Sequence, residues 1–142
     1  MACALGSRTK VQYLLASGVD EAMQQSVVPM LHVPDLRATV EWEWYETVAG
    51  FTRVRVNEED GEMLWALLRY GNGEFMLNAG GKASDAWRRE VDLYMHTAEG
   101  VDAVHARLKG KVDVVEEPHD MDYGMRELIV RDLNRFWITF AE

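Results

Sequence analysis

The sequence has little of what several protein classes require. It contains a single cysteine, Cys3, which excludes an internal disulfide and a cysteine-based zinc site. No stretch approaches the roughly 20 apolar residues that a membrane-spanning helix needs. The first residues also lack the basic start and apolar run of a signal peptide. Basic residues number 15 against 24 acidic ones, and the resulting net charge of -9 argues against nucleic-acid binding. We therefore expect a cytoplasmic protein that contacts neither membranes nor nucleic acids.

What is present suffices for one globular domain. The chain has 142 residues, of which 48% are hydrophobic. Residues 1–26 differ from the rest in pattern. Ser7 could cap a short helix that Gly18 would end, and a second helical piece could run from Asp20 to Gln25. We interpret this segment as an N-terminal extension that packs on the domain or on a neighbour.

From residue 27 onward, one order of elements occurs twice. A strand (Val27–Val33) and a helix from Asp35 to about Val48 precede three strands, and a second strand (Val91–Thr97) and helix (Val101–Leu108) precede three more. The remaining strands are expected at Phe51–Asn57, Met63–Tyr70 and Glu74–Asn78, and at Asp113–Glu117, Met125–Arg131 and Phe136–Phe140.

The order βαβββ, repeated, predicts an α+β domain over residues 27–142. Module one would span 27–79 and module two 90–142. Each module would form a curved mixed sheet with one helix on its back, and two such sheets, from one chain or from two, would enclose a cleft.

Two segments of the sequence carry a recognisable pattern. Residues 33–45 read Val-Pro-Asp-Leu-Arg-Ala-Thr-Val-Glu-Trp-Glu-Trp-Tyr and are followed by Ala-Gly-Phe at 49–51. They resemble the first-module signature of the vicinal-oxygen-chelate superfamily of glyoxalases, bleomycin-resistance proteins and dioxygenases. Residues 123–128, Tyr-Gly-Met-Arg-Glu-Leu, and residues 131–136 resemble the bleomycin-resistance branch. Members of that branch have Asp-Pro-x-Gly at the positions of residues 132–135. Leu133 and Arg135 replace that proline and glycine, and we expect Asn134 to supply the positive φ angle of the turn.

The resemblance implies four metal-ligand positions, on the first and last strands of each module. In this sequence they carry Val28, Asn78, Asp92 and Thr139. Enzymatic relatives have His, Gln or Glu there, because a catalytic divalent ion needs imidazole or hard oxygen donors. Valine cannot ligate, and Asp92 alone will not hold a metal. We therefore assign no catalytic residue, expect no cofactor and lean against an enzyme.

Two histidines keep an alternative open. His32 and His96 occupy equivalent positions on the first strands of the two modules, in phase with Val28 and Asp92. They could bind a metal or act as acid and base, although a solvated histidine at a strand end explains each equally well. The alternative is a metal-dependent glyoxalase-like lyase, isomerase or dioxygenase with atypical ligands.

The leading interpretation is a non-enzymatic protein that sequesters a small aromatic molecule, neutral or cationic, as the resemblance to bleomycin-resistance proteins implies. The negative net charge and five tryptophans are compatible with such a ligand, although each aromatic side chain could equally fill the core. The resemblance also implies a homodimer. A third interpretation is an interaction or regulatory module that uses residues 1–26 as its contact. The predicted cleft residues are His32, Trp65, Asn78, Trp87, Asp92, Tyr94, His96, Glu127, Trp137 and Thr139.

Overall fold

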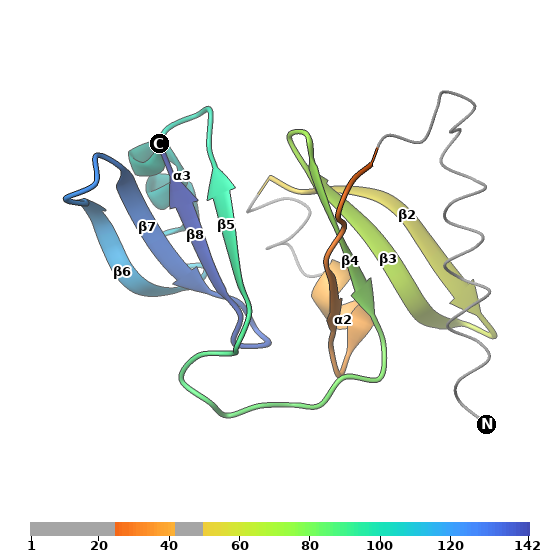
Figure 1. The fold of residues 1–142 in the computed structure, drawn as a ribbon. Coiled ribbons are helices and arrows are strands. Elements are labelled where there is room, and N and C mark those ends of the chain that lie inside the picture. The colour runs from red at the N-terminus through yellow and green to blue at the C-terminus, as the bar shows by residue number, and fades with distance from the viewer. Residues whose placement is uncertain (1–24, 42–49) are drawn as a thin grey trace.

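The computed structural model describes residues 25–41 and 50–142. The helices expected before residue 25, and the part of the first predicted helix beyond Glu41, lie outside these ranges, so the role of residues 1–26 stays a prediction. The described residues form two four-stranded sheets, each with one short helix behind it (Figure 1).

The first module forms a mixed sheet in the order β1-β4-β3-β2. Strand β1 runs parallel to β4, and the other neighbours are antiparallel. Helix α2 begins where Asp35 accepts the backbone N–H of Ala38 on its side chain at 2.9 Å, as expected of an N-cap. The elements are β1 (Met30–His32), α2 (Leu36–Glu41), β2 (Thr52–Glu59), β3 (Glu62–Tyr70) and β4 (Gly73–Asn78).

The second module repeats this arrangement in the order β5-β8-β7-β6, with β5 parallel to β8. Its elements are β5 (Asp92–His96), α3 (Val101–Leu108), β6 (Asp113–Asp120), β7 (Arg126–Arg131) and β8 (Trp137–Ala141). The predicted α+β fold of two βαβββ modules is therefore confirmed.

Two strands differ from their predicted bounds by three residues at one end, and the other six by one or two. Strand β1 begins at Met30 instead of Val27, because Val27 is almost fully exposed and Pro29 has no N–H to donate to a ladder. Strand β6 continues to Asp120, so Pro118 lies inside it. An edge strand tolerates a proline, and the register of β6 against β7 shifts on this stretch.

The turn between β7 and β8 also differs from the prediction. The residue with a positive φ angle is Arg135, at 68°, instead of Asn134. Asp132 accepts the backbone N–H groups of Asn134 and Phe136 on its carboxylate at 2.9 and 2.7 Å, which fixes the turn. The side chain of Asn134 is thus free for a different contact.

The helix-bearing sides of the two sheets share one core. A single cluster of buried apolar residues contains Leu36 and Val40 of α2 together with Val104 and Leu108 of α3. In each helix the two residues are four positions apart and therefore lie on the same face. Each helix packs this apolar face on the sheets. The two modules are therefore packed as one unit.

Specific contacts cross between the modules. The side-chain amide of Asn134 donates to the hydroxyl of Thr39 at 3.0 Å, and both residues are buried. The rings of Tyr70 and Phe140 meet edge to face, with centroids 6.2 Å apart. A buried hydrogen bond of this kind joins the last turn of module two to α2 of module one.

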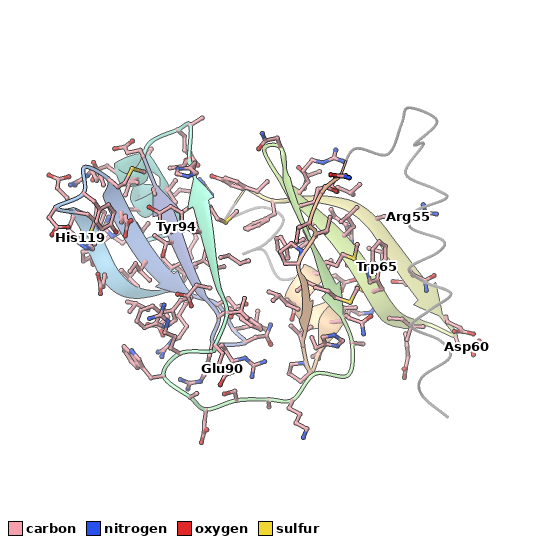
Figure 2. All side chains as sticks on the ribbon, in the orientation of Figure 1. Arg55, Asp60, Trp65, Glu90, Tyr94 and His119 are labelled. Carbon is pink, nitrogen blue, oxygen red and sulfur yellow. The ribbon has the colours of Figure 1, made fainter. Side chains whose placement is uncertain are left out.

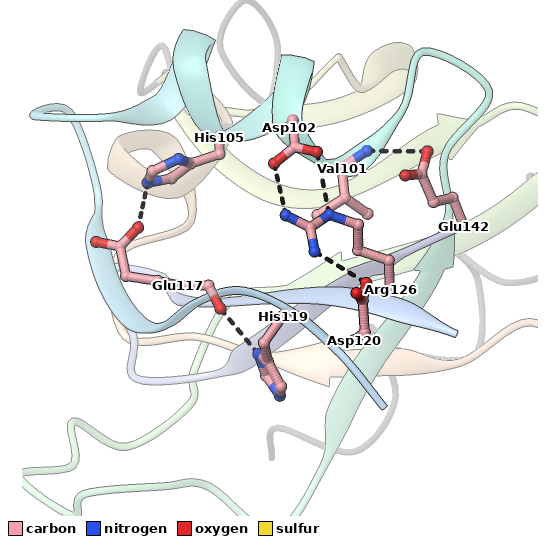
Figure 3. Close-up of polar contacts among 8 residues, drawn as sticks. All are labelled: Val101, Asp102, His105, Glu117, His119, Asp120, Arg126 and Glu142. Atoms are coloured by element: carbon pink, nitrogen blue, oxygen red, sulfur yellow. Dashed lines mark hydrogen bonds and ion pairs between the residues drawn. The ribbon is translucent and has the colours of Figure 1, made fainter. Parts of the chain in front are cut away.

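Polar contacts fix the outer side of α3 to β6 and β7 (Figure 3). Arg126 donates to Asp102 and to Asp120, both at 2.9 Å, and the bonds to Asp102 raise the pKa of the Arg126 guanidinium and lower that of the carboxyl. His105 Nε2 lies 2.6 Å from a Glu117 carboxylate oxygen. Such exposed pairs contribute little free energy individually, but together they orient the helix.

The other side of each sheet points away from its helix, because side chains alternate along a strand. We call these sides the free faces. On the second sheet, the free face carries Asp92, Tyr94 and His96 of β5, Glu127, Ile129 and Arg131 of β7, and Trp137, Thr139 and Ala141 of β8.

Strand β5 is the edge of the second sheet. The backbone N–H of Thr97 bonds to Ala141 at 2.9 Å, and in a parallel ladder every second residue bonds to the neighbour. Leu93 and Met95 therefore direct their N–H and C=O groups to β8. Tyr94 and His96 direct theirs outward, where no backbone bond to another described residue receives them.

No helix among the described residues is long and apolar enough to cross a membrane.

Candidate functional site

The ten predicted cleft residues fall into two groups on two sheets. His32, Asn78 and Trp65 lie in one row across β1, β4 and β3, on the free face of the first sheet. The other seven lie on or beside the free face of the second sheet: Asp92, Tyr94, His96, Glu127, Trp137, Thr139 and, in the preceding loop, Trp87. Figure 2 labels Trp65 and Tyr94, one on each sheet.

The three first-sheet residues differ in exposure. Trp65 is buried and packs with Leu67 and Met76 in an apolar cluster of the free face. His32 is exposed and Asn78 half-buried, and the two are neighbours in the register, with Nδ1 of His32 3.5 Å from the amide nitrogen of Asn78. The second sheet carries the larger and chemically more varied group.

Two tryptophans form one end of this face. Trp87 and Trp137 meet edge to face with ring centroids 6.3 Å apart, and we call them the tryptophan pair. The guanidinium of Arg131 lies over the Trp87 ring at 4.4 Å, and that of Arg88 over the Trp137 ring at 4.5 Å. Trp87 remains 63% exposed despite its contact with Arg131.

The tryptophan pair is held in place by hydrogen bonds to one carbonyl. The backbone oxygen of Trp87 accepts from Arg131 Nη1 at 3.0 Å and from Trp137 Nε1 at 3.1 Å. Arg131 is anchored in turn by the carboxylate of Asp113. Although Trp87 belongs to the loop between the modules, it is fixed on the sheet, and it is nevertheless 63% exposed.

A buried carboxylate forms the other end. One oxygen of Glu127 accepts the hydroxyl of Tyr94 at 2.6 Å and that of Tyr123 at 2.7 Å. Glu127 is 4% exposed, whereas Tyr94 and Tyr123 are 50% and 60% exposed. The bonds to Glu127 raise the pKa of each tyrosine to about 12, so both hydroxyls stay protonated donors. We call these three residues the tyrosine–glutamate cluster.

Sequence reasoning missed Tyr123, which lies in the turn between β6 and β7 and folds back over Glu127. Its position four residues before Glu127 was the only signal. Tyr94 reaches Glu127 across β8, where the register places the small Ala141 between His96 and Glu127.

The donors present do not fit the divalent metal that the resemblance implies. Asp92 is paired with Arg88, Thr139 is buried, and Val28 has no donor. Within residues 25–41 and 50–142, no group of three or more His, Cys, Asp or Glu side chains is arranged to hold a metal ion.

His32 and His96 line separate hollows between the modules. His96 lies in one of about 380 Å³, with Tyr94, Asp92 and Glu74, and its ring meets that of Tyr94 at 5.5 Å. His32 lies in one of about 500 Å³ beside Arg88. Within this chain the two histidines therefore line different hollows.

Neither a protein-family model nor a curated protein sequence matches the chain. Solved structures do match. TioX from Micromonospora sp. ML1 superposes with a TM-score of 0.67 at 22% identity, over 84% of this chain and 98% of its own. The fosfomycin resistance protein FosX from Listeria monocytogenes gives 0.63 at 13% identity, over 84% and 93%. A PhnB protein from Bacillus cereus, a putative 3-demethylubiquinone-9 3-methyltransferase, gives 0.61 at 15% identity, over 82% and 98%.

At these identities the similarity establishes architecture alone. Together with the two βαβββ modules, it shows that the chain has the vicinal-oxygen-chelate, glyoxalase-like fold.

Proposed function

We propose that the protein binds a small, flat aromatic molecule on the free face of the second sheet and holds it unchanged, as a bleomycin-resistance-like sequestration protein. The observation that carries this proposal is Trp87, a large aromatic side chain that is 63% exposed and yet fixed by hydrogen bonds at its backbone.

An exposed indole on a hydrogen-bonded backbone suits ligand binding for two reasons. A planar ligand stacked on it would bury apolar area on both partners, and aromatic pairs contribute about 0.5–1.5 kcal/mol beyond that area. Little conformational entropy would be lost, because the loop is already ordered by Arg131 and Trp137.

The donor set supports binding without turnover. The carboxylate of Asp92 is neutralised by Arg88, and the remaining family metal positions carry Val28, Asn78 and Thr139. A metal-dependent lyase, isomerase or dioxygenase would need His32 and His96 as ligands. Titration with Zn, Ni, Mn and Fe(II) followed by calorimetry tests that alternative, because stoichiometric binding lost in His32→Ala or His96→Ala would favour the enzyme.

We further propose that the protein acts as a homodimer. Predicted site residues lie on the free faces of both sheets. In a dimer, the free face of the first sheet of one copy, with His32 and Asn78, could lie against the free face of the second sheet of the other copy. Sedimentation of the purified chain tests this assembly. FosX, similar in fold, is a fosfomycin resistance protein, and a role in tolerance of a toxic small molecule is the corresponding biological proposal.

The direct test is calorimetric titration with acridine, at a pH where acridine is neutral. We expect binding that Trp87→Ala weakens on the order of tenfold, as loss of a stacking partner with its buried area implies. Val54→Ala, which removes an exposed apolar side chain on the first sheet, is the matched control and should bind like the parent. Mass spectrometry should recover acridine unchanged. Equal affinity of the Trp87→Ala variant and the parent would contradict the proposal.

A further inference from the structure

Glu127 is a buried carboxylate without a counter-ion among the described residues. It is 4% exposed, and none of the ion pairs within residues 25–41 and 50–142 includes it. Taking an unpaired carboxylate out of water costs several kcal/mol unless donors replace the lost hydration. Tyr94 and Tyr123 replace part of it.

The two tyrosines satisfy only one of the two carboxylate oxygens. Both hydroxyls donate to Oε1, at 2.6 and 2.7 Å, and no hydrogen bond from a described residue reaches Oε2. A carboxylate has about four acceptor positions, so the cluster keeps acceptor capacity in reserve. Because Tyr94 and Tyr123 are half exposed or more, the cluster opens to the surface between them.

The electrostatic surroundings favour a positive charge at this place. The carboxylates of Glu127, Asp122 and Glu116 all act on the Tyr123 hydroxyl and help to raise its pKa. Besides Glu116, the neighbouring strands place two histidines beside the cluster, His96 of β5 and His119 of β6, and His119 is already paired with Glu116. Among residues 25–41 and 50–142, three carboxylates act at this place, and no lysine or arginine forms an ion pair with Glu127.

We infer that the tyrosine–glutamate cluster is a binding subsite for a protonated amine of the ligand. The ammonium N–H would donate to Oε2 of Glu127, and the rings of Tyr94 and Tyr123 would flank the charge. This inference rests on the proposed function, and it narrows the ligand to an aromatic molecule that carries a basic nitrogen on an extension.

The register fixes how long that extension must be. Glu127 lies opposite Ala141 on β8, and Trp137 precedes Ala141 by four residues on the same face. At about 3.3 Å per strand residue, the two ends of the site lie about 13 Å apart. A ring stacked on the tryptophan pair would therefore reach the carboxylate through a flexible chain of several carbons.

Three acridine probes test the inference in the unmodified protein: one with a terminal primary amine on a pentyl chain, one with the corresponding alcohol, and one with a trimethylammonium group. We expect the amine to bind on the order of tenfold or more tightly than the alcohol, as a hydrogen bond to a charged group implies. We expect the trimethylammonium probe to bind less tightly than the amine, because it has no N–H to donate. Equal affinity for amine and alcohol, or for amine and trimethylammonium, would overturn the inference.

Glu127→Gln should abolish the preference for the amine, so that the amine and the alcohol bind with similar affinity. Asp122→Asn is the matched control, since it removes a nearby charge without touching the cluster, and it should keep the preference. An equal loss in both variants would mean a diffuse field instead of a subsite. If Glu127→Gln fails to fold, the probe series in the unmodified protein still decides. Parent acridine, which lacks the chain, reports on the proposed function separately, because its binding depends on Trp87 and not on Glu127.

Discussion

The hydroxyls of Tyr94 and Tyr123 both donate to one oxygen of Glu127. These hydrogen bonds determine the pH at which the two tyrosines ionise. The bond to the carboxylate raises the pKa of each tyrosine from 10.0 to about 12 in the folded protein. A raised pKa means that folding favours the neutral phenol. The stabilisation is therefore fully present below the unfolded value near pH 10 and is lost as the pH rises through about 12.

We predict that Tyr94 and Tyr123 ionise late in a spectrophotometric titration of the folded protein. Tyr94→Phe and Tyr123→Phe should each remove one late step, and Glu127→Gln should move both steps back toward the ordinary value. Tyr70→Phe, on the core side of the first sheet, should leave both late steps in place. Late ionisation that survives Glu127→Gln would show that the carboxylate is not its cause.

Some properties of single residues could be predicted from the sequence and others could not. Strand alternation placed Trp137 and Thr139 on one face correctly, because the phase of a strand is local. The positive φ angle was assigned to Asn134 and belongs to Arg135, since the side chain of Asn134 is used by Thr39, a partner far away in the chain. The role of Tyr123 depends on the same kind of distant packing.

Among the elements, β5 has two unlike edges. Leu93, Met95 and Thr97 bond their backbone to β8, whereas Tyr94 and His96 direct theirs outward. A strand with one free edge can accept a further strand.

Amide hydrogen exchange should therefore alternate along β5. We predict slow exchange at Leu93, Met95 and Thr97 and faster exchange at Tyr94 and His96, because only bonded amides need an opening of the sheet before they exchange. Two-dimensional NMR in deuterated buffer at low protein concentration measures it. Uniformly slow exchange along the strand would instead show that another strand covers the edge.

Elements also differed in how well the sequence predicts them. Helix α3 has the predicted bounds Val101–Leu108, because its apolar spacing and the glycines at both ends are local signals. Strand β6 was predicted three residues too short, because a proline and polar neighbours normally end a strand. Its position at a sheet edge, which only the tertiary fold determines, allows it to continue.

At the scale of the molecule, the two modules should unfold together. One apolar cluster contains side chains from both helices and both sheets, and the bond from Asn134 to Thr39 crosses between the modules. We predict a single calorimetric transition whose enthalpy agrees with the van't Hoff value. Asn134→Ala should destabilise the whole transition by about 1–3 kcal/mol, the cost of a broken buried hydrogen bond. Separate transitions for the modules would contradict this prediction.

The duplication itself, and the α+β class, followed from the sequence because the order of elements repeats. The way in which the two modules pack did not follow, since the apolar faces of α2 and α3 are equally suited to a core within one module or across two. The structure joins them, through Tyr70 and Phe140 among others.

This shared core has a consequence for the loop between β4 and β5. The segment 79–91 connects two halves whose association depends on side-chain packing and not on the covalent link. A chain cut within this loop should therefore remain one particle, and two separately produced halves, each with half of an apolar interior exposed, should reassemble on mixing. The two modules would then behave as a pair of complementing fragments.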